Sequence, residues 1–219
     1  AFLAFIFLAP VHAQMLFQDD FTGCSSCSIF GWNNDCGGID ITNTSFSLAY
    51  PGYIGSGVGN AALISSSLGQ GSLSQSFSNF SPTIYVGFLV NAQFANFSIP
   101  GGGCAPGTDV ILAFDPNAGG NSNDHGLVLN SSGGGFKFGL SSDFGSAFTA
   151  ATYSYNMTYL VVMKRTFGQI SLFINPTLGG TEPSSDVSIG YSNGSGNSAN
   201  GLAISGRRSE ERRVGKECL

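Results

Sequence analysis

Carboxylate side chains are scarce in this chain, and their spacing limits the hydrolytic chemistry that it can perform. Residues 14–205 contain a single glutamate, Glu182, which stands beside Pro183 in a segment typical of a turn. A retaining glycosidase needs two carboxyl groups about 5 Å apart, which on one strand means alternate positions. Asp19 and Asp20 are adjacent, so they point to opposite faces of a strand. Residues 14–205 therefore favour a domain without a paired-carboxylate catalytic site.

Serine and histidine chemistry has little more support. Residues 190–194 match the G-x-S-x-G nucleophile motif, which needs a strand before the serine and a helix after it. A Gly/Ser/Asn-rich segment follows instead. His125 precedes that serine, whereas the α/β-hydrolase order places the histidine last. We interpret His125 as a residue at the edge of a loop rather than as a general base.

Cysteines near the N-terminus predict disulfide bonds. The chain has 5 cysteines, and those within residues 14–205 are Cys24, Cys27, Cys36 and Cys104. An even number in an exported domain is typical of disulfides, and the pairing cannot be read from the sequence. Cys24 and Cys27 also have the spacing of a redox pair or half a zinc site. The sequence has no second such pair, and no helix is expected after it to lower a thiol pKa.

Aspartates at the ends of predicted loops are candidate ligands for a structural Ca²⁺. Asp115 and Asp124 bracket one Asn-rich loop, and Asp19 lies in the first predicted strand. Loop carboxylates and amides are the hard oxygen ligands that Ca²⁺ prefers. The alternative is that these residues only form turns, as Asp and Asn commonly do, because no complete ligand pattern is present.

Aromatic side chains are the candidates for binding a sugar, which needs a flat apolar surface with polar groups beside it. We single out Trp32, Tyr53 and Tyr155. Trp32 lies between Cys27 and Cys36, where a disulfide could hold its ring outward. The alternative for each is a place in the core, where aromatic side chains contribute most to packing.

The elements that would position these residues are short β-strands. Apolar or alternating runs recur between clusters of Gly, Asn, Ser and Pro, and helical periodicity is nearly absent. The runs fall at 15–21, 39–50, 61–65, 73–77, 83–93, 109–115, 126–129, 135–140, 147–153, 158–167 and 169–175. Phe167 and Gly168 predict a tight hairpin turn, and 101–107 and 190–201 predict surface loops. The pattern predicts an all-β fold, an antiparallel β-sandwich.

Composition sets the outer limits of function. The chain has 219 residues, of which 42% are hydrophobic and 12% aromatic, enough for one domain with a sizeable core. Lys and Arg number 8 against 13 Asp and Glu, which argues against a nucleic-acid partner. No apolar run reaches the length of a membrane-spanning helix.

The two ends of the chain differ from the middle. Residues 1–13 are an apolar stretch followed by Val-His-Ala, typical of a partial secretory signal peptide, with a buried first strand as the alternative. Residues 208–218 resemble a translated sequencing adapter, so we interpret 206–219 as an artefact tail; the alternative is a basic, partner-binding tail. We therefore expect one secreted domain over 14–205, truncated at its C-terminus.

Several strand-and-turn segments resemble the LamG-like jelly rolls of the concanavalin A-like lectin/glucanase superfamily. The segments are 16–21, 48–53, 83–90, 135–140, 159–164 and 171–176. The departures are a Cys-rich insert at 24–36 and the Gly-rich loop around Cys104. The resemblance implies a jelly-roll β-sandwich from a secreted or cell-surface bacterial protein, in a family that often carries one structural Ca²⁺.

Function follows less directly from this resemblance, because a fold hosts many functions. The expected function is a non-catalytic module that binds a polysaccharide or a cell-surface glycan, or that serves adhesion. One alternative is a fragment of a secreted glycoside hydrolase whose catalytic residues lie outside this chain. The other is a structural spacer domain without a ligand.

Overall fold

A computed structural model describes residues 33–37, 41–54, 56–64, 71–80, 83–93, 111–115, 125–142, 144–191 and 199–206. These residues form strands, turns and loops, with no helix among them. The prediction of an all-β, antiparallel fold is thereby confirmed. In the described part of the chain there is accordingly no helix that is long and apolar enough to cross a membrane.

Two antiparallel sheets make up most of the structure, consistent with a β-sandwich. The large sheet has the strand order β1 (Asn33–Gly37), β4 (Gly71–Phe80), β13 (Ala199–Gly206), β6 (Leu112–Asp115), β7 (His125–Ser132), β8 (Gly135–Ser142) and β9 (Gly145–Phe148). The small sheet has the order β12 (Val187–Gly190), β11 (Gln169–Ile174), β10 (Thr158–Thr166) and β5 (Ile84–Asn91). A separate pair joins β2 (Ile41–Asn43) to β3 (Ala62–Ile64).

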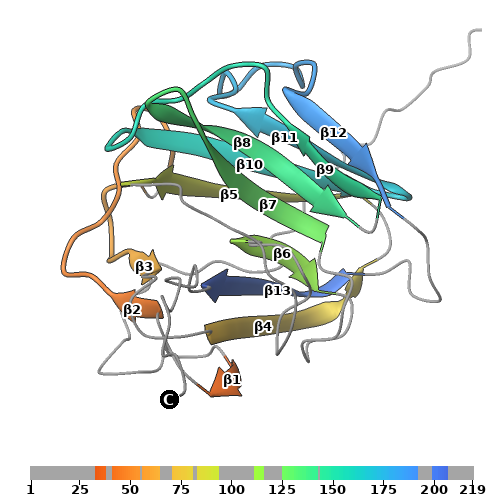
Figure 1. The fold of residues 1–219 in the computed structure, drawn as a ribbon. Coiled ribbons are helices and arrows are strands. Elements are labelled where there is room, and N and C mark those ends of the chain that lie inside the picture. Colours follow the sequence, from red (N-terminus) through yellow and green to blue (C-terminus); the bar gives the residue numbers. More distant parts are fainter. Residues whose placement is uncertain are drawn as a thin grey trace, which may run out of the picture.

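The large sheet curves around the core. Figure 1 shows it running from β1 and β4 through β13 and β6 to β7, β8 and β9, which lie beside the small sheet. Strand β8 contacts β11 and β12, and β9 contacts β12. The two sheets therefore meet where the β8–β9 end of the large sheet lies against the β11–β12 end of the small sheet. The segment between β2 and β3, drawn in orange, runs along one side of the molecule between the levels of the two sheets.

The core lies between the inner faces of these sheets because alternate residues of each strand point inward. Val161 and Met163 of β10 are fully buried there, together with Leu127, Phe138 and Leu140 from the large sheet. The residues between them on β10 point to the opposite face of the small sheet. That outer face carries the candidate site.

Several predicted strand limits need correction. The predicted strand 39–50 ends at Asn43, and a loop follows in which the N–H of Gly57 donates to the carbonyl of Leu48 at 2.8 Å. The predicted loop 190–201 gives way to β13 at Ala199. The predicted hairpin turn is confirmed, since Thr166 pairs with Gln169 and Gly168 has a φ of 73°. A glycine adopts this left-handed conformation without strain.

Candidate functional site

The structure places two of the three predicted sugar-binding aromatics, and Trp32 lies outside the described residues. Tyr155 stacks on Phe136, with ring centroids 5.5 Å apart and an interplanar angle of 29°. Phe136 is fully buried, so one face of the Tyr155 ring is used in core packing. Tyr53 lies in the loop between β2 and β3 and faces the small sheet, as described below.

The predicted metal ligands and cysteines mostly lie outside the described residues, namely Asp19, Asp124, Cys24, Cys27 and Cys104. The backbone places Asp115 at the end of β6 and Cys36 in β1. Within the described ranges, no three His, Cys, Asp or Glu residues gather closely enough to hold a metal ion. The Ca²⁺ site and the disulfides therefore stay predictions.

A cleft that the sequence did not reveal lies on the outer face of the small sheet. Strand register aligns Tyr85 with Lys164 in one row, and Gly87 with Val162 and Phe173 in the next. Phe173 follows Leu172, whose side chain points inward, so the Phe173 side chain points to the outer face. It is nevertheless only 4% exposed. The loop from 175 to 186 crosses this face and covers it, which explains the burial of an outward side chain.

Both ends of this covering loop are fixed to the sheet. Asn175 has a φ of 51°, a conformation that asparagine tolerates better than most residues. Its N–H donates to the carbonyl of Leu160 at 2.7 Å, and its Oδ1 accepts from the N–H of Leu160 at 2.9 Å. At the other end, the Asp186 carboxylate accepts from the N–H of Ile174 at 2.7 Å. The loop therefore leaves and rejoins the sheet at defined points.

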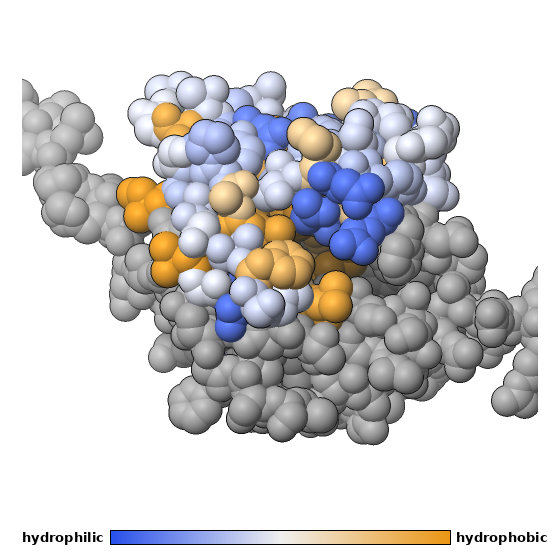
Figure 2. Space-filling view, turned by 90° about the vertical axis from the view of Figure 1, so that its left-hand side faces the viewer, coloured by the Kyte–Doolittle hydropathy of each residue, from blue (hydrophilic) through white to orange (hydrophobic). Residues whose placement is uncertain are grey.

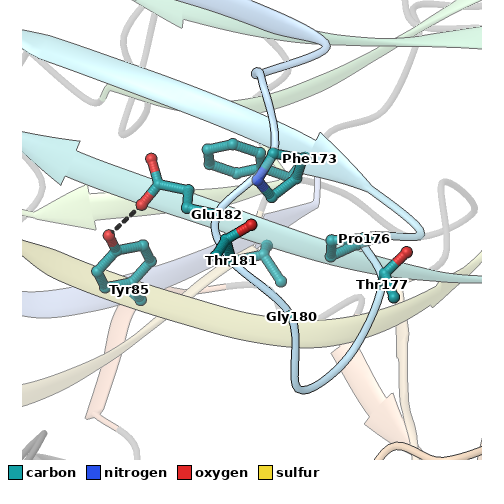
Figure 3. A pocket seen from close by; sticks show the side chains of 9 residues that line it. Tyr85, Phe173, Pro176, Thr177, Gly180, Thr181 and Glu182 are labelled. Carbon is teal, nitrogen blue, oxygen red and sulfur yellow. Dashed lines mark hydrogen bonds between the residues drawn. The ribbon is translucent and has the colours of Figure 1, made fainter.

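Glu182 joins the middle of the loop to the sheet (Figure 3). The Lys164 ammonium donates to its Oε1 at 2.7 Å and its Oε2 at 3.0 Å. The Tyr85 hydroxyl donates to Oε2 at 2.5 Å. The Lys164 Nζ also lies 5.4 Å from the centre of the Tyr85 ring, within the range of a cation–π contact. One carboxylate thus organises an aromatic ring and an ammonium group at the surface.

These contacts shift the pKa of each group so that the charged pair is favoured. The hydrogen bonds from Lys164 and Tyr85 lower the pKa of the Glu182 carboxyl. The hydrogen bond to Glu182 raises the pKa of Lys164 and, together with partial burial, that of Tyr85. At neutral pH the carboxylate and the ammonium are therefore both charged, and Tyr85 keeps its proton.

The cleft has a volume of about 250 Å³ and combines apolar and polar walls. Its lining residues include Tyr85, Val162, Phe173, Pro176, Thr177, Thr181 and Glu182. Figure 3 shows the loop residues on one side of this space and the Tyr85 ring on the other. Such a cleft suits a small polar ligand that also has an apolar face.

Tyr53 lies next to this cleft, above β5. Its hydroxyl oxygen is 3.0 Å from the position that a Cβ atom on Gly87 would take, and Gly87 pairs with Val162 in the cleft. Burial raises the pKa of Tyr53. A Cβ on Gly52 would lie 3.6 Å from Leu178, so the Tyr53 loop also reaches the 175–186 loop.

The face of the molecule on the side of the β2–β3 segment is of mixed polarity. Figure 2 views the molecule from this side and shows hydrophobic residues interspersed with hydrophilic ones.

The opposite, inner face of the small sheet holds a buried cation. Arg165 is 5% exposed, and its guanidinium carbon lies 5.2 Å from the centre of the Tyr191 ring. The Tyr191 ring also packs on His125, with centroids 4.7 Å apart. His125, interpreted above as a residue at the edge of a loop, is the first residue of β7, and it is buried rather than exposed. Ser192 of the G-x-S-x-G match lies outside the described residues.

The fold and the cleft together define an antiparallel, two-sheet β-protein with an aromatic and carboxylate-bearing cleft on one outer face. No protein-family model, curated protein or solved structure matches the chain. The resemblance to LamG-like jelly rolls therefore stays a prediction.

Proposed function

We propose that this protein is a non-catalytic carbohydrate-binding module, a secreted jelly roll of the concanavalin A-like type. Its ligand is a polysaccharide or a cell-surface glycan, held in the cleft beside Tyr85. The antiparallel all-β architecture is compatible with this proposal, and residues 1–13 support export by their resemblance to a signal peptide. Ca²⁺ at Asp19, Asp115 and Asp124 remains part of the proposal as a structural ion.

The observation that carries the proposal is the grouping of Tyr85, Lys164 and Glu182. The Tyr85 side chain is 53% exposed, so part of its ring is free to contact the C–H face of a sugar. Beside it, Lys164 supplies donors and Glu182 supplies acceptors for sugar hydroxyls. Hydrogen bonds to charged groups are stronger than those between neutral groups. The site therefore offers both kinds of contact that a sugar needs.

The same geometry argues against hydrolysis in this cleft. Glu182 is the single carboxylate among the described residues that line it, whereas most glycosidases flank the bond with two carboxyl groups. The pKa of Glu182 is also lowered, so its carboxyl group is a poor proton donor at neutral pH.

Affinity electrophoresis tests the proposal. Native gels would contain mixed-linkage β-glucan, xylan, galactomannan, alginate or polygalacturonate. We expect at least one of these polysaccharides to retard the protein, and we expect Tyr85→Ala to weaken the retardation by about tenfold in affinity.

Phe144→Ala is the matched control, because Phe144 is also an exposed aromatic, 68% against 53% for Tyr85, and lies beside β9 of the other sheet. It should leave the retardation unchanged. Equal retardation of Tyr85→Ala and wild type, or no retardation in any gel, would contradict the proposed function.

A further inference from the structure

We infer that the cleft takes an uncharged glycan chain, in which one sugar ring contacts Tyr85 and the next contacts Tyr53. This inference rests on the proposed function and specifies its ligand. Tyr53 and Tyr85 come from segments far apart in the sequence, yet both lie on the outer face of β5.

The spacing along β5 fits a chain rather than a single sugar. Tyr85 and Gly87 are alternate residues, so they share one face and are separated by about 7 Å. The Tyr53 hydroxyl lies directly over Gly87. Val162, which pairs with Gly87 from the neighbouring strand β10, lines the cleft beside this position. Two aromatic side chains thus follow one another along β5, with an apolar residue of the cleft next to the second.

Gly87 is what allows Tyr53 to take this position. A Cβ atom on residue 87 would stand 3.0 Å from the Tyr53 hydroxyl oxygen, closer than ordinary van der Waals contact. A side chain there would force the Tyr53 hydroxyl to shift by a few tenths of an ångström. Gly87→Ala therefore disturbs the position of Tyr53 while leaving the Tyr53 side chain itself intact.

The loop that carries Tyr53 is closed on itself before any ligand binds. The N–H of Tyr53 donates to the carbonyl of Tyr50 at 3.2 Å, and the Ser56 hydroxyl donates to the same carbonyl at 2.8 Å. The N–H of Gly57 closes the loop onto the carbonyl of Leu48. A loop whose backbone is already held in place loses little conformational freedom when one of its side chains contacts a ligand.

The charges of the cleft favour a glycan ligand that carries no charge. Lys164 and Glu182 neutralise each other at 2.7 Å, so the described residues of the cleft carry no excess positive charge to attract an acidic polysaccharide. A uronate ring would instead bring its carboxylate next to that of Glu182, and like charges at close range repel. Hydroxyl groups can share the donors and acceptors of the pair without this cost.

Calorimetric titration with oligosaccharides of increasing length, prepared from whichever polysaccharide retards the protein, tests this inference. In the wild type we expect a rise of about tenfold in affinity when the ligand first spans both tyrosines. Tyr53→Ala should abolish that rise, and Gly87→Ala should reduce it. Each variant should leave the affinity for the monosaccharide within about twofold. Raising NaCl from about 50 mM to about 500 mM should change the affinity little, since no net charge is recognised.

Two further variants keep this test decisive. Ile54→Ala is the control, because Ile54 adjoins Tyr53 and is 96% exposed; it should bind as the wild type does. Tyr53→Phe keeps the ring and should keep most of the rise, which separates loss of contact from loss of folding.

If Tyr53→Ala and Gly87→Ala bind like the wild type while Tyr85→Ala does not, the inference is overturned and the proposed function stands. Retardation by alginate or polygalacturonate alone would overturn the neutral ligand. Binding to none of the polysaccharides would overturn both the inference and the proposed function.

Discussion

Strand β10 places two neighbouring cations on opposite faces of the small sheet, in opposite environments. Arg165 points into the sandwich against Tyr191, and burial lowers the pKa of its guanidinium. Lys164 points outward, has 22% of its side chain exposed, and has its pKa raised by Glu182. The inner cation is enclosed by the fold, whereas the outer one remains within reach of a ligand. Inner-face residues of β10 should therefore govern stability, and outer-face residues should govern binding.

The largest difference in the free energy of unfolding should come from truncating two adjacent apolar residues of β10, one on each face. Met163 is fully buried on the inner face, so we expect Met163→Ala to cost about 2–5 kcal/mol in the free energy of unfolding. Val162 lies on the outer face under the 175–186 loop and is only partly buried. Val162→Ala should cost less than about 1.5 kcal/mol. Urea unfolding of both variants measures this difference, and equal costs would break the comparison.

Two Tyr→Phe substitutions, one on each face of the small sheet, should differ less in their cost to the free energy of unfolding. The buried Tyr191 hydroxyl donates to the carbonyl of Thr166 at 2.7 Å. We expect Tyr191→Phe to cost about 1 kcal/mol, because the partly buried Thr166 carbonyl loses a partner while the ring stays in place. The exposed Tyr85 hydroxyl can be replaced by water, so Tyr85→Phe should change stability by less than about 0.5 kcal/mol. A larger effect at Tyr85 than at Tyr191 in urea unfolding would contradict this assignment.

The smallest effect should be the pH dependence of the outer ion pair. Lys164 and Tyr85 lower the folded-state pKa of Glu182, so its contribution to stability is present above the ordinary glutamate pKa of about 4.3. That contribution is lost as the pH falls through the lowered pKa. The stability difference between wild type and Glu182→Gln should therefore be positive at neutral pH and vanish in acid.

This pH effect should stay below about 1 kcal/mol, because the pair is exposed. Thermal unfolding of both proteins between about pH 7 and about pH 2.5 measures it. A difference that grows on acidification would contradict the sign. Because Lys164→Met removes the partner of Glu182, the same pH series on that variant should show a weaker dependence.

Local sequence signals predicted β5, β10 and β11 of the small sheet, whereas no predicted run covers its edge strand β12. The predicted runs 83–93, 158–167 and 169–175 correspond to β5, β10 and β11. Each combines β-branched or aromatic residues with a flanking turn signal, and these are local properties. Strand β13 was missed because Ala199–Gly206 contains small and polar residues of low strand propensity. It is held between β4 and β6 by pairing with distant segments.

The cleft was missed for the same physical reason. Glu182 could be recognised from the sequence only as an isolated carboxylate beside a proline. Its contact with Tyr85 spans 97 positions along the chain and depends on the path of the 175–186 loop across the sheet. Tyr53 was singled out as an aromatic residue, but its position over Gly87 depends on the fold of the β2–β3 segment.

Mapping the ligand contact by NMR shows directly whether a glycan occupies the cleft beside Tyr85. Isotope-labelled protein would be titrated with oligosaccharides of mixed-linkage β-glucan, xylan and galactomannan, and backbone amide shifts would be followed. We expect the largest shifts on β5 around Tyr85 and Gly87, on β10 around Lys164, and on the loop 175–186. Shifts confined to β9 and the turn at Phe144, or no shifts with any of these sugars, would contradict this expectation.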